Sequence, residues 1–464
     1  MHRDAPHLLS PALRADPPAD DTVARMLEGA EGPHALAERI AAVNREIGRW
    51  DSNGGLAGWE PDPGLDPRAA AALKDYLARC PGLPDWADPA LIARAEDIFM
   101  DRSMLSCLLL FCASLPECYV LPDLSAVLQA AGQLEQHTDY RIRSTAAMIF
   151  PVMMKGGLRS PNGAGVAQAL KVRLIHATIR YLILRGTPPS FEALAGKPLP
   201  ALAPAGGGIY HQLYAHGWDS SRDGLPCNQE ELAYTLLTFH FVFLRGLRRL
   251  GLGLEREDEE AYLHAWNVLG HLLGIERELM AWTMDEARAR FKTMQAPGLA
   301  PARGADPRPA LTAALMATMA DYIPVRLFKP FPNLLTRLLC GRRAARALGL
   351  VTRASLVSYL LFIAGYGLIR VVDGVMRLFV KDFSITGMLT RAAGYRLVTR
   401  FLMDQTRPLR LPAALVGQAG DLAAAAPVAS QGPRWVRRLE ARIAGSAPAP
   451  EPGPGPGPGP GPQR

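Results

Sequence analysis

The apolar residues of this chain recur at helical spacing through most of its length, and Pro and Gly interrupt the pattern. The strict alternation that is typical of a half-buried strand is almost absent. The sequence therefore predicts an all-α fold. No repeat of fixed period stands out, which argues against a solenoid. Helices are expected over residues 34–49, 68–80, 89–115, 121–135, 139–154, 163–185, 190–196, 228–250, 256–274, 276–292, 308–320, 332–348, 354–380 and 385–405. Asn228, with Glu231 three residues on, has the spacing of a capping box and is expected to cap the helix over 228–250.

The two ends differ from the centre in composition. Residues 1–30 are rich in Pro, Asp and Ala, and the chain closes on a Pro-Gly repeat that cannot bury surface. We expect a disordered segment over 1–30, one large helical domain over 31–405, and a C-terminal extension with a disordered tail over 406–464. Because 49% of the residues are apolar, the central part has ample material for a core.

Charge and cysteine usage narrow the function classes. The net charge of +7 is spread along the chain, so a dedicated nucleic-acid binder is not expected, and an anionic surface or ligand is weakly favoured. The six cysteines include no CxxC pair and are interpreted as reduced core thiols. The N-terminus lacks the apolar stretch of a secretory signal, so a cytoplasmic location is expected.

Two segments are conspicuously apolar. Ser355–Ile369 is shorter than the roughly 20 residues of a spanning helix, so we expect a buried central helix there. The alternative is shallow peripheral contact with a membrane. Met104–Ala113 is interpreted as core, and both segments are candidates to line an apolar cavity.

The helix expected over 163–185 carries an unusual polar face. Arg173, His176 and Arg180 stand at i, i+3 and i+7 and therefore project from one side. A neutral imidazole is a common iron ligand, and guanidiniums suit the anionic propionates of a haem. The alternative is a structural histidine on a basic helix, which on spacing alone is favoured.

A second polar patch lies on the helix expected over 139–154. Arg141, Ser144 and Thr145 share one face, where they could bind dioxygen or serve to solvate a helix end. On spacing alone the second interpretation is preferred. His264 and His271 share a face of a later helix, but without an adjacent carboxylate they favour packing or hydrogen bonding over metal ligation.

Motifs of other enzyme classes are missing from the sequence. There is no GxGxxG after a strand, no Walker A motif, no HExxH and no GxSxG. Nucleotide chemistry, zinc proteolysis and α/β-hydrolase chemistry therefore lose their usual support.

Taken in order, RxxST at residues 141–145 and RxxHAxxR at 173–180 resemble the catalytic domain of the rubber oxygenases, or latex clearing proteins. The stretches NQEELAYTLLTF and EEAYLHAWNVLGHLLGI, within residues 228–275, resemble the wider superfamily that includes the membrane-bound oxygenase of mycophenolic acid synthesis. The resemblance covers roughly residues 95–400. The joint order of the motifs is more specific than either motif alone.

The resemblance implies an all-helical fold with a globin-like core around haem b. It assigns the proximal iron ligand to His176 and support of the haem or its pocket to Arg173 and Arg180. On the distal side the family pattern is Arg-x-x-Lys-Thr, so Arg141 and Thr145 match. Ser144 stands where the rubber oxygenases have a lysine that occupies or gates the distal iron position.

The implied activity is a haem-dependent oxygenase that uses dioxygen to oxidise, and in the family to cleave, a C=C bond. If the chain stays inside the cell, a small isoprenoid or lipid is a more accessible substrate than a bulk polymer. The alternatives are a haem peroxidase or hydroxylase, and a helical protein that binds haem or lipid without turnover. The family's catalytic glutamate has no clear counterpart; Asp123, Glu135 and Asp139 are the nearby acids.

Overall fold

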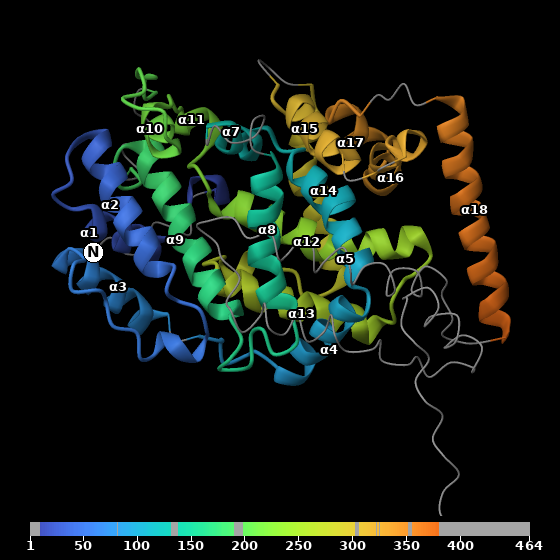
Figure 1. Ribbon diagram of the computed structural model, residues 1–464, viewed down its shortest axis with the longest axis horizontal. Coiled ribbons are helices and arrows are strands. Elements are labelled where there is room, and N and C mark those ends of the chain that lie inside the picture. The colour runs from blue at the N-terminus through green and yellow to red at the C-terminus, as the bar shows by residue number, and fades with distance from the viewer. Residues whose placement is uncertain are drawn as a thin grey trace, which may run out of the picture.

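The computed structural model confirms the all-α fold (Figure 1). It describes residues 10–80, 82–130, 138–189, 198–301, 306–321, 323, 325–350 and 355–379. Over these ranges the β-structure is a single isolated bridge, between Leu199 and Trp218. The α-helices are α1 Pro17–Leu27, α2 Gly32–Ile47, α3 Pro67–Arg79, α4 Pro89–Asp101, α5 Ser103–Leu109, α6 Leu115–Cys118, α7 Pro122–Ala130, α8 Thr138–Met153, α9 Gly165–Leu184, α10 Ile209–Ala215, α11 Ser220–Asp223, α12 Gln229–Leu250, α13 Arg256–Leu272, α14 Met284–Gln295, α15 Arg308–Asp321, α16 Phe331–Cys340, α17 Arg342–Ala347 and α18 Leu356–Phe379.

The N-terminal segment contains an ordered helix, so the prediction of disorder over residues 1–30 was wrong for the described residues 10–30. Helix α1 has Pro17 in its first turn, where the missing amide hydrogen costs nothing. Its buried residues Ala19, Val23 and Met26 form a stripe at helical spacing that packs against α3 and α9. The stripe is only three turns long, and the Pro- and Asp-rich surroundings obscured it.

Helices α8 and α9 lie side by side in the centre of the molecule, with α1–α3 on one side and α12–α14 on the other (Figure 1). Helix α4 packs along α13, and α12 contacts both α13 and α14. The predicted cap of α12 is confirmed, since the amide of Glu231 donates to the Asn228 side chain at 2.9 Å.

The helix predicted over 89–115 is divided into α4, α5 and the π-helical turn η4 (Leu110–Ser114), which continues into α6. Pro116 has no amide hydrogen, so the ordinary bond back to the Cys112 carbonyl cannot form. The Cys340 thiol lies 3.8 Å from the carbonyl oxygens of Cys112 and Ala113 and covers this break. The prediction that Met104–Ala113 is core is confirmed for its described side chains, most of which are buried.

Two more predicted helices are divided by breaks in the chain. The prediction over 276–292 becomes the short turn Arg277–Leu279 followed by α14. The prediction over 332–348 becomes α16 and α17, separated by Gly341, whose φ of 89° only glycine adopts readily. The predicted helices over 190–196 and 385–405, the end of that over 121–135, and the 406–464 extension lie outside the described residues.

The expectation that Ser355–Ile369 is a buried central helix was wrong. Helix α18 stands at the edge of the molecule (Figure 1), and most of its described side chains are exposed. An apolar composition predicts removal from water but does not specify the apolar partner.

The cysteines are free thiols, as predicted, and all but Cys80 are buried. Burial raises the pKa of Cys107, Cys112 and Cys227 to about 12, so these thiols stay protonated and inert.

No single helix within the described ranges has both the length and the apolar composition of a membrane span. The pair Pro89–Asp101 and Leu105–Cys118 meets both criteria together, although the chain bends by 89° between them.

Candidate functional site

Helix α9 is fixed at its N-terminus by a side chain that is distant in sequence. Asn53 donates to the carbonyls of Gly157 and Ser160, both at 2.9 Å, and its Oδ1 accepts the amide of Val166 at 3.0 Å. Gly163 is required in this turn because a Cβ there would lie 2.3 Å from the carbonyl oxygen of Gly156. The α8–α9 connection is therefore tight, and α9 begins at a defined position.

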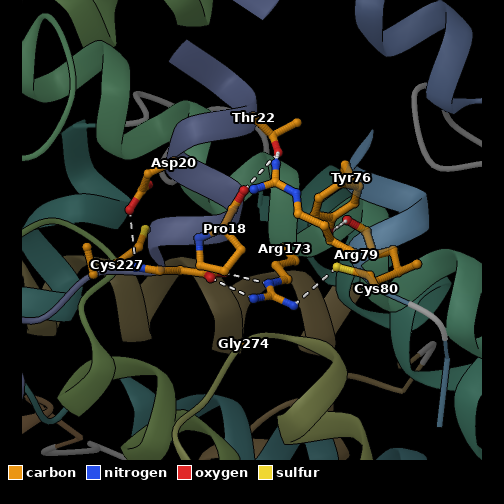
Figure 2. A network of polar contacts seen from close by, with 12 residues as sticks. Pro18, Asp20, Thr22, Tyr76, Arg79, Cys80, Arg173, Cys227 and Gly274 are labelled. Carbon is orange, nitrogen blue, oxygen red and sulfur yellow. Dashed lines mark hydrogen bonds and ion pairs between the residues drawn. The ribbon is translucent and has the colours of Figure 1, made fainter. Parts of the chain in front are cut away.

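The first predicted arginine of the site ties α9 to α1. Figure 2 shows the Arg173 guanidinium between α1 and Cys80. Its Nε and Nη2 donate to the two carboxylate oxygens of Asp16, both at 2.6 Å, and both side chains are largely buried. Gly274 lies against this pair, where a Cβ would approach Asp16 Oδ2 to 2.4 Å. A paired geometry of this kind fixes the middle of α9.

The second predicted arginine, Arg180, also contacts α1, at Asp20, one turn after Asp16. Arg180 Nε is 3.3 Å from Asp20 Oδ1, and its Nη1 donates to the Cys227 carbonyl at 3.3 Å. Burial raises the pKa of Asp20 to about 6, against the opposing effect of the Arg180 charge. Asp16 and Asp20 were missed at the sequence level, because they lie in the segment predicted to be disordered.

His176 lies between these two arginines on α9. Its Nδ1 is buried and has no hydrogen-bond partner in the structure. Burial, and next the charge of Arg180, lower the pKa of the imidazole to about 4, while Asp16 opposes the shift. The ring is therefore neutral at pH 7, the form in which histidine binds a metal.

A second polar group on α9 also lacks a partner. Both amide atoms of Gln168 are buried without a hydrogen bond, eight residues before His176. Eight residues correspond to about 12 Å along a helix axis. Ile175, His176 and Ile179 are half-buried on a helix whose other faces are covered, so α9 offers an apolar surface around the imidazole. An unsatisfied neutral imidazole in apolar surroundings fits the axial ligand of a haem.

The predicted distal residues Arg141, Ser144 and Thr145 lie on α8, the helix that packs directly against α9. Thr145 is half-buried. The side chains of Arg141 and Ser144 lie outside the described set, as do those of Asp123, Glu135 and Asp139.

The other predicted histidine pair is structural. His264 Nε2 accepts the amide of Asp88 at 2.8 Å, and both His264 and His271 pack edge-on against Trp86. This confirms the preference for packing over metal ligation. In the part of the chain that the structure describes, no group of three or more His, Cys, Asp or Glu side chains could hold a metal ion.

His240 is a buried histidine that the sequence did not single out. It lies on α12, fully buried, and neither ring nitrogen has a hydrogen-bond partner. Burial lowers its pKa to about 3. Its only sequence signal is a polar residue within an apolar run, TFHFVF, which is typical of core histidines as well.

A cavity of about 310 Å³ opens between α12 and α14. Its floor contains Phe241 and Phe291, and Arg245 at its edge is paired with buried Glu117. None of its lining residues comes from α8 or α9, so this cavity is separate from the surface around His176.

Comparisons with known proteins agree with this arrangement. The family described as ER-bound oxygenase mpaB/B'/Rubber oxygenase, catalytic domain, matches residues 120–367, more than half of the chain. The chain belongs to this family. The matched region includes α8 and α9 entire, and therefore both predicted motifs.

A rubber oxygenase from Streptomyces sp. (strain K30) is 24% identical over 338 residues, which are 72% of this chain and 70% of that protein. The structure of latex clearing protein in the closed state matches with a TM-score of 0.59 at 21% identity, over 79% of this chain and 85% of that one. The resemblance inferred from the two motifs is confirmed, and the fold is that of latex clearing protein. Family membership makes this chain an oxygenase.

Proposed function

We propose that the chain is a haem b-dependent oxygenase that oxidises a C=C bond of a hydrophobic isoprenoid or lipid-like substrate with dioxygen. The observation that carries the proposal is the neutral, unsatisfied imidazole of His176 on α9, within the domain that the oxygenase family matches. A haem bound there would supply the iron that activates dioxygen.

We assign the axial ligand to His176. Arg180 contributes by helping to lower the pKa of the imidazole, which keeps it in the ligating form. The Asp16–Arg173 pair fixes the helix that carries His176, so its role is positioning. Ile175 and Ile179 present apolar surface next to the ring, which excludes water and suits a hydrocarbon substrate.

The polar groups on the opposite side of the haem are assigned to Arg141, Ser144 and Thr145 of α8. The family membership and the packing of α8 on α9 support this assignment. Polarity and steric access on that side decide between dioxygen activation and simple binding. Since Ser144 replaces the lysine of the rubber oxygenases, we propose that the distal position is open in the resting protein.

The test is dioxygen uptake by the haem-loaded protein with an isoprenoid alkene and with its saturated analogue. The proposal expects uptake with the alkene and carbonyl products, and no uptake with the saturated compound. His176→Ala is expected to abolish uptake, and His271→Ala is the matched control, because His271 lies exposed on α13. Equal uptake with the saturated analogue would indicate a hydroxylase, and bound haem without uptake would indicate a carrier.

A further inference from the structure

The exposed large apolar side chains of the described residues are concentrated at one edge of the molecule. Apart from Leu202, all of them lie between Val325 and Val371. The most exposed are Leu356 at 72%, Leu368 at 65% and Val371 at 62%. Contiguous exposed apolar surface of this kind is typical of a membrane or protein contact.

Helix α18 is attached to the body along one narrow seam. Ser358 donates to the Leu327 carbonyl at 3.0 Å, Phe362 packs edge-on against Phe331, and Tyr366 donates to the Arg249 carbonyl at 2.8 Å. Three of these seam residues follow each other at i, i+4 and i+8. Over Leu356–Leu368 the remaining sides of α18 are apolar and exposed, which is not the pattern of a helix that faces water.

The same region has a one-sided charge. From residue 322 to residue 372 the sequence contains eight basic residues and no Asp or Glu. The basic residues are Arg326, Lys329, Arg337, Arg342, Arg343, Arg346, Arg353 and Arg370. Exposed apolar side chains combined with this excess of basic residues match the surface of an anionic bilayer.

We propose that η8 (Arg326–Phe328), α16, α17 and α18 form a surface, the apolar–basic surface, that binds the face of an anionic lipid bilayer. The apolar part of α18, Leu356–Leu368, rises only about 20 Å, less than the roughly 30 Å of a bilayer core. It therefore lies in the interface and does not cross it. This inference does not depend on haem at His176.

Two other partners could cover this surface, a second copy of the chain or residues 380–464, and charge argues against both. A second copy of this chain would bring another basic surface against the first. Residues 380–464 carry eleven basic and five acidic residues, so they too repel the apolar–basic surface. Only a partner with negative charge satisfies both the apolar and the basic side chains.

The test is sedimentation of the full chain with vesicles of phosphatidylcholine alone and of phosphatidylcholine with phosphatidylglycerol. We expect binding to the anionic vesicles that weakens with added salt, and at least tenfold weaker binding to the neutral ones. Equal binding to both vesicles, or binding to neither, would overturn the proposal.

The double variant Leu360→Asp, Leu368→Asp tests the apolar part and is expected to weaken binding at least tenfold. Both side chains point to solvent, so the melting temperature is expected to match wild type. Leu202→Asp is the matched control, because Leu202 is 46% exposed in a different part of the chain, and it should bind like wild type.

Arg326→Glu tests the basic part. Reversal of this charge is expected to weaken binding more than fivefold at low salt, since each basic residue near an anionic surface contributes about fivefold. Full vesicle binding by the Leu360→Asp, Leu368→Asp variant would overturn the proposal. So would a wild-type dimer that this variant dissolves, because the occupant would then be a second copy.

Discussion

Replacement of Arg173 by Ala tests whether this arginine fixes α9 or would contact the proposed haem. The Asp16 side chain is 4% exposed and receives two bonds of 2.6 Å from Arg173. Removing one partner of a buried pair leaves the other charge without compensation, which costs about 3–5 kcal/mol. We expect that loss in the free energy of unfolding for Arg173→Ala, and a similar loss for Asp16→Ala.

The assay is urea unfolding of the haem-free protein, followed by haem titration. Because both single variants disrupt one interaction, the double variant is expected to lose less than the sum, with a coupling energy of about 1–3 kcal/mol. Arg173→Lys should recover only part of the stability, because an ammonium cannot make the paired contact. Unchanged unfolding of Arg173→Ala together with lost haem binding would refute the positioning role and indicate direct contact with haem.

Three further predictions follow from the buried titratable groups and from Ser144. Burial raises the pKa of Asp20 from 3.8 to about 6. Between these two pH values the folded protein holds a proton that the unfolded chain has released. The contribution of Asp20 to the free energy of unfolding therefore falls as the pH rises from 3.8 to about 6. The unfolding free energy of Asp20→Asn minus that of wild type should therefore rise by on the order of 3 kcal/mol between those pH values and be constant above them; a flat difference contradicts this. His240→Leu removes two unsatisfied nitrogens from the core and is expected to raise the unfolding free energy by about 1–3 kcal/mol in urea unfolding, whereas a loss would show that His240 has a partner. Wild-type protein loaded with haem is expected to bind imidazole or cyanide readily by absorption titration, and Ser144→Lys to bind them less; equal affinities would contradict an open distal position.

Much of the fold was predictable because helical periodicity and capping are local signals. The helix over 228–250 and its cap at Asn228 are found as predicted, as are α8 and α9. The break at Arg102, within 89–115, was not predicted, because no Pro or Gly marks it in the sequence. The helix within residues 10–30 was not predicted, because its buried stripe is short and the Pro- and Asp-rich segment around it has the composition of a polar tail.

In the candidate site, too, the residues close together in sequence could be predicted and their distant partners could not. His176 and its two arginines were singled out by their spacing on one helix, and their proposed role came from the family resemblance of the motif. The partners Asp16 and Asp20 were not found, because Arg173 and Asp16 are 157 residues apart and a pairing over that distance leaves no local pattern. The apolar segment within α18 was recognised as unusual, but its exposure depends on where the chain places it.

The most direct test of the account is the absorption spectrum of His176→Gly loaded with haem, before and after addition of imidazole. If His176 is the axial ligand, the variant loses the wild-type Soret band, and free imidazole restores it by filling the space of the missing ring. A His176→Gly spectrum identical to wild type without imidazole would contradict the account.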